Sequence, residues 1–132
     1  MSNYNDVRLA LGASIQDYQP DLNVYYYSPQ TLVPPAAIVQ PRAHQTIDYL
    51  QAQTSGFANW HFNVLLVVGL VDEEAAQAQV GELVSPRSPL IQALQNTKLT
   101  TGYVTVTNGG VSSMMFAKGL YAYADLSVVV RT

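Results

Sequence analysis

Two long apolar stretches predict the central strands of a β-sheet. In residues 59–71 one face is apolar throughout, while the other begins with His61 and becomes apolar further along. In residues 120–131 apolar side chains alternate with a mixed set that includes tyrosine, serine and Asp125. We therefore expect a central strand beneath packed helices. The last strand should have one core face and one face that is solvated or forms an interface.

Shorter segments predict further strands and one large loop. Aromatic or apolar runs bounded by turn residues indicate strands at residues 23–27, 36–39, 43–52 and 103–107. The Asn-Gly-Gly sequence that follows residue 107 is typical of a turn. The segment at residues 109–119 is too long for a tight hairpin and carries three large apolar residues without a regular pattern, so we expect a projecting loop there.

Three segments have the apolar spacing of amphipathic helices. They are residues 6–18 with Asn5 as N-cap, residues 72–83 with Asp72 as N-cap, and the residues that follow Ser88 and Pro89. The order of elements predicts an α+β fold: a mostly antiparallel β-sheet with an N-terminal helix and two consecutive helices packed on it. The length of 132 residues suits a single domain, residues 1–132.

Charge is scarce in this chain. Asp, Glu, Lys and Arg make up 11% of the residues, against about 25% in a typical soluble protein. Gln, Asn, Ser, Thr and nine tyrosines take their place, and such a surface does not repel copies of itself. We therefore expect self-association. The net charge of −3 and the scattered Lys and Arg residues argue against sequence-specific binding of nucleic acid.

The sequence contains no signal for secretion or membrane insertion. The N-terminus lacks the features of a signal peptide, and the longest apolar run, residues 64–71, is too short to span a bilayer. We expect no membrane association and a cytoplasmic origin. Because the chain has no cysteine, disulfides and thiolate chemistry are excluded.

Candidate catalytic and metal-binding groups are few. His44 and Asp48 have the spacing of two metal ligands on a helix, but Pro41 disfavours a helix here and no third ligand is near. His61 could act as a base, although a hydrogen-bonded histidine at a strand end is the favoured interpretation. We expect no catalytic residue, no metal and no cofactor.

Five segments together resemble a known viral family. They are NDVRLALGASIQ, NVYYYSPQTLVPPAAIVQP, IDYLQAQTSGFANWHFNVLLVVGLVDEEAAQAQV, SPLIQALQ and GLYAYADLSVVV, which extend over nearly the full chain, from Asn5 to Arg131. In order and character they are similar to the tail terminator proteins (head-tail connector or tail completion proteins) of long-tailed bacteriophages, the siphoviruses, particularly those of phages of actinobacteria.

This resemblance implies a structural virion protein that is not an enzyme. Such proteins form a ring, a hexamer, on the last ring of the major tail tube protein, stop tube polymerisation and offer a surface to the head-closure or connector protein. The implied location is the head-tail junction of the virion, after assembly in the host cytoplasm, and DNA passes through the ring. A head-to-tail interface whose rotation closes produces such a ring.

The residues expected at ring or tube contacts come from the chain itself, because the family has no short interface motif. The first choice is Met114, Met115, Phe116 and Lys118, since methionine and phenylalanine adapt to a partner surface. The second choice is Arg42, Arg87 and the strand residues Tyr25, Tyr26 and Tyr27. These tyrosines could instead stack on bases or sugars, but no basic residue lies beside them, which favours core on one face and interface on the other.

Three alternatives stay open. The loop predicted at residues 109–119, which carries Met114 and Met115, could fold back over the sheet and cap the core. The chain could be another connector ring, such as the head-closure or adaptor protein. It could also be a small ligand-binding domain or an enzyme that uses His61, Asp125 and the tyrosines.

Overall fold

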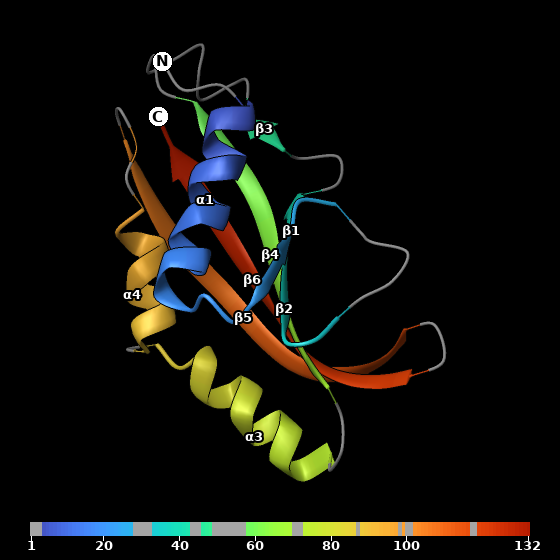
Figure 1. The fold of residues 1–132 in the computed structure, drawn as a ribbon. Coiled ribbons are helices and arrows are strands. Elements are labelled where there is room, and N and C mark those ends of the chain that lie inside the picture. Colours follow the sequence, from blue (N-terminus) through green and yellow to red (C-terminus); the bar gives the residue numbers. More distant parts are fainter. Residues whose placement is uncertain are drawn as a thin grey trace.

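The computed structural model describes residues 4–27, 33–42, 46–48, 58–69, 73–86, 88–97, 99, 102–116 and 119–132. A six-stranded sheet has the order β1-β2-β4-β6-β5, and β3 pairs with β4 beside this path. The strands are β1 (Asn23–Tyr25), β2 (Ala36–Pro41), β3 (Ile47–Asp48), β4 (Asn59–Gly69), β5 (Tyr103–Phe116) and β6 (Gly119–Arg131). The helices are α1 (Tyr4–Tyr18), α3 (Glu73–Leu83) and α4 (Pro89–Gln95) (Figure 1). All strand pairs are antiparallel except β1–β2, so the predicted α+β fold is confirmed.

Strand β4 lies inside the sheet, as its apolar sequence predicts. It pairs with β2 on one side and with β6 on the other. Alternation directs Val64 and Leu66 into the main core beneath the helices, and it directs Leu65 and Val67 to the opposite face. The two faces of the sheet therefore have different surroundings, which we call the helix face and the outer face.

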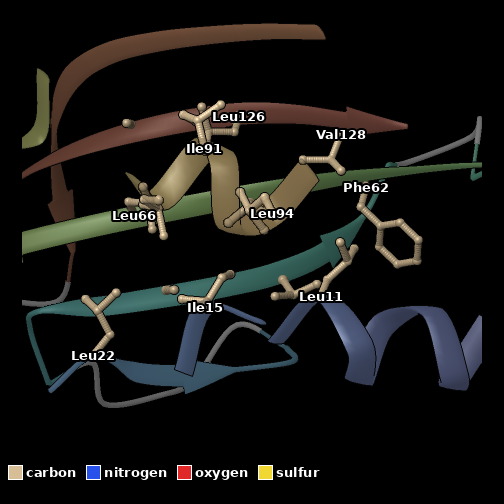
Figure 2. Close-up of a cluster of buried hydrophobic side chains, with 14 of the residues drawn as sticks. Leu11, Ile15, Leu22, Phe62, Leu66, Ile91, Leu94, Leu126 and Val128 are labelled. Carbon is tan, nitrogen blue, oxygen red and sulfur yellow. The ribbon is translucent and has the colours of Figure 1, made fainter. Parts of the chain in front are cut away.

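The main core fills the space between the helix face and the three helices. Figure 2 shows Leu11 and Ile15 of α1 and Leu94 of α4 gathered over Leu66 of β4 and Leu126 of β6. All five side chains are at most 1% exposed. Each buried leucine or isoleucine contributes about 1.5–3 kcal/mol relative to an exposed one, so this cluster holds the helices on the sheet.

Helix α1 begins at Tyr4, two residues earlier than its sequence suggests. Because Tyr4 is already helical, Asn5 lies within the first turn, and its prediction as the N-cap is wrong. The amide oxygen of Asn5 instead accepts a hydrogen bond of 3.0 Å from the Arg8 guanidinium. The helix ends at Tyr18, two residues before Pro20, as expected.

Helices α3 and α4 follow each other closely, and Ser88 connects them. Its hydroxyl accepts a hydrogen bond from the Ile91 N–H at 3.3 Å and donates one to the Leu83 carbonyl at 2.7 Å. The predicted N-cap at Ser88 is therefore confirmed, with Pro89 at the start of the helix. Asp72, the predicted cap of α3, lies outside the described residues.

The strand predicted at residues 43–52 is present only at Ile47–Asp48 within the described chain. These residues pair with Trp60 and Asn59 of β4. Residues 43–45 and 49–52 lie outside the description.

The predicted loop at residues 109–119 is wrong for most of its length. Strand β5 continues through Gly109 and Gly110 to Phe116 and pairs with β6 along the whole way. The Asn-Gly-Gly residues pair with β6 instead of forming a turn, and a β-bulge directly precedes them, between Val106 and Asn108. The segment therefore forms the outer half of a long β-hairpin, which extends past the end of β4 (Figure 1).

Candidate functional site: the outer face and the β5 edge

The outer face carries a small apolar cluster that is rich in tyrosine. Ala36, Ile38 and Val67 are at most 2% exposed, although none of the described helices contributes to this cluster. The half-buried side chains packed on them come from β1, β4 and β6: Tyr25, Leu65, Tyr121 and Tyr123. We call these seven residues the outer cluster. Aromatic side chains that are half-covered on a sheet face are typical of interfaces.

The three consecutive tyrosines point to different surroundings. Tyr25 belongs to the outer cluster, and Tyr26 packs against the main core. Tyr27 follows the end of β1 and is 70% exposed. Tyr26 thus packs on the core as expected, whereas an interface role for Tyr25 and Tyr27 stays a prediction.

Arg8 lies between the rings of Tyr4 and Tyr26 in a cation–π cluster that contains none of the predicted contact residues except Tyr26. The Arg8 guanidinium lies 5.4 Å from the Tyr4 ring centre and 5.6 Å from that of Tyr26. Tyr4 in turn stacks on Phe62 with ring centres 5.7 Å apart. The spacing of Tyr4 and Arg8, one helical turn apart, is the signal that could have revealed the first of these contacts.

Asp125 is the acidic residue of β6, and its side chain is exposed on the outer face. It lies opposite Leu65 of β4 and Gly110 of β5, neither of which offers a charged or hydrogen-bonding side chain. Partial burial by the surrounding structure raises the pKa of the Asp125 carboxyl above its ordinary value of 3.8.

His61 and Asp125 do not form a catalytic pair. His61 lies opposite Val129, and Asp125 lies opposite Leu65, four residues along the same strand. At the rise of a β-strand, this separation is about 13 Å. Two cavities of about 520 and 220 Å³ lie between α1 and α4 and between α4 and β5, and neither is lined by His61 or Asp125. This arrangement gives no support to an enzyme that uses both residues.

Strand β5 forms one edge of the sheet. In the described part of the chain, no backbone hydrogen bond from another segment reaches β5 on the side away from β6. Its fourteen residues, YVTVTNGGVSSMMF, contain no charge and no proline. From Thr107 to Ser112 every residue is exposed, and Val111 is 43% exposed. A long uncharged edge of this kind is a site for pairing with another strand.

The predicted contact residues occupy different parts of the chain. The backbone of Met114, Met115 and Phe116 lies in the outer half of the hairpin, opposite Tyr121, Leu120 and Gly119 of β6. Arg42 is exposed just after β2, where its backbone N–H donates to the His61 carbonyl at 2.9 Å. Arg87 and Lys118 lie outside the described residues. Met114, Met115 and Phe116 are thus part of the β5 edge strand. Arg42 follows β2, which is separated from β5 by β4 and β6 in the sheet.

The described residues contain no group of three or more His, Cys, Asp or Glu side chains placed to hold a metal ion. Of the two residues considered and disfavoured as metal ligands, His44 lies outside the described residues, and Asp48 is in β3. None of the described helices is both long and apolar enough to cross a membrane.

Comparisons with known proteins add no family assignment. No model of a known protein family matches the chain, and no curated protein shows significant similarity to it.

Proposed function

We propose that this chain is a structural subunit of a bacteriophage virion: a tail terminator that forms a ring on the end of the tail tube, stops tube polymerisation and provides the joining surface for the head. The observation that carries the proposal is the distribution of charge over the sheet. In the six strands, the charged residues are Asp48, Asp125 and Arg131. A sheet edge and an outer face this poor in charge suit lasting burial between protein subunits.

The proposed mechanism is steric. One side of the ring complements the exposed end of the tube, and the opposite side no longer recruits tube protein. The β5–β6 hairpin suits the contact with the tube or a neighbouring subunit, since it extends past β4 and carries Met114, Met115 and Phe116 in its outer half. A head-to-tail contact between copies closes the ring, which we propose to be a hexamer. The remaining side meets the head-closure protein, and no cofactor takes part.

The test is to add the purified chain to the major tail tube protein of the same phage and to image the products by negative-stain electron microscopy. We expect rings of the chain at tube ends. A variant with Met114→Ser, Met115→Ser and Phe116→Ser should remain folded but lose end binding. The matched control is Leu9→Ser, which removes an exposed leucine of α1 far from the hairpin and should retain it.

Other outcomes of this experiment would distinguish a tail terminator from other connector proteins. Rings that bind capsid portals but never tube ends would assign the chain to the head-closure or adaptor proteins. Binding to neither structure would reject the virion proposal as a whole.

A further inference from the structure

We propose that the free protein forms a two-fold symmetric dimer, in which the outer half of β5, residues 108–116, pairs antiparallel with the same segment of a second copy. The pairing would join the two sheets into one. This contact goes beyond the proposed function and does not rest on it, because a two-fold contact cannot by itself close a head-to-tail ring.

The first argument is that this half of the edge has none of the usual protections against pairing. Natural edge strands carry charges, prolines or bulges, or they are covered by another element. The bulge between Val106 and Asn108 protects the inner half of β5. Helix α4 lines a cavity with residues 106–109, so it lies beside the centre of the strand and not along residues 110–116 of the described edge. Residues 108–116 have no charge, no proline and no further bulge against β6.

The second argument is geometric. Residues 108–112 are exposed, so an approaching strand meets no described side chain that covers them. Gly109 and Gly110 lie within this stretch, and the space around the Cβ position of Gly110 is empty within 4 Å. A pairing centred close to Val111 would bring the two copies of this 43% exposed side chain together and bury both.

The third argument identifies the partner as a second copy. An antiparallel strand pair is self-complementary, so one edge can serve both subunits. The opposite edge of the sheet, β1, has three residues and offers little length for pairing. Since β5 has no charge, two copies do not repel each other along this edge, despite the net charge of −3.

The test is light scattering of the purified chain over a range of concentrations, without tube protein. We expect a reversible monomer–dimer equilibrium. Val111→Lys should raise the dissociation constant at least about tenfold, because the two lysines would face each other across the two-fold axis. Val111→Thr keeps a β-branched, uncharged residue and should retain the dimer. Leu9→Lys adds the same charge on α1 and should also retain it.

Hydrogen exchange identifies the surface directly. Backbone amides within residues 108–116 should become more protected as the concentration of the wild-type chain rises, and this gain should disappear in Val111→Lys. A protein that stays monomeric at all concentrations, or a dimer that Val111→Lys does not weaken, would overturn the proposal. So would a dimer whose concentration-dependent protection lies elsewhere. Each of these results leaves binding to tube ends to be decided separately, because tube protein is absent.

Discussion

At the scale of single residues, close packing of α1 on the segment after β1 depends on a glycine. Gly12 is buried, and a Cβ atom at this position would overlap the ring of Tyr26. The Tyr26 ring also lies against Arg8, which restricts its movement. Glycine is an unfavourable residue inside a helix, so its presence here reflects contact with the aromatic ring.

Gly12→Ala should therefore lower the free energy of unfolding by about 1–3 kcal/mol, although alanine favours a helix. Gly81→Ala in α3 is the matched control, because nothing lies within 4 Å of its Cβ position. This control should raise the free energy by about 0.5–1 kcal/mol. Urea denaturation measures both variants, and equal stabilisation by both would contradict the packing described for Tyr26.

The raised pKa of the Asp125 carboxyl makes the free energy of unfolding depend on pH. Because the pKa of its carboxyl is higher in the folded protein than in the unfolded chain, the folded state holds the proton more tightly. Its contribution to stability therefore falls as the pH rises from 3.8 through the raised pKa. Asp125→Asn should make the decline in unfolding free energy over this range shallower, whereas Asp125→Glu keeps an ionisable group and should retain it. An unchanged slope in Asp125→Asn would refute the assignment.

At the scale of elements, Ser88 holds the end of α3 and the start of α4 with one hydroxyl. Ser88→Ala should lower the free energy of unfolding by about 1–2 kcal/mol, because the Ile91 N–H loses its acceptor and the Leu83 carbonyl its donor. Ser85→Ala is the control, since Ser85 is exposed and its hydroxyl donates one described hydrogen bond, to the Gly81 carbonyl. It should change stability by no more than about 0.5 kcal/mol, as measured by thermal unfolding.

The elements also show what the sequence could reveal. Strand β4 and the helices were predictable, because their apolar positions repeat with the period of a buried face. The start of strand β5 was predictable at residues 103–107, but its continuation to Phe116 was not, since residues 107–112 are exposed and carry no alternating pattern. Their conformation depends on pairing with β6, which a local sequence signal such as Asn-Gly-Gly does not reveal.

The candidate contact surface was predictable only in part, because strand pairing cannot be seen in a local sequence pattern. Met114, Met115 and Phe116 were identified from their composition, but the strand edge that accompanies them is visible only in the topology of the sheet. The outer cluster likewise gathers Tyr25, Tyr121 and Tyr123 from strands that are distant in sequence.

At the scale of the whole molecule, the shortage of charged residues is clearest in the β-sheet. The helices cover one face of the sheet, and the charged residues of the outer face and its edges are few. A subunit that binds copies of itself and further proteins has little free surface to keep charged. The proposals for a terminator ring and for pairing at β5 both explain this shortage by contacts that bury the outer half of β5.

The most direct test of the terminator role is the length of tail tubes assembled from purified tube protein as the amount of this chain is increased. The proposed function predicts that mean tube length falls with each addition and that rings are present on the ends of the shortened tubes. Tubes of unchanged length with bare ends, at a concentration where the chain is folded, would contradict it.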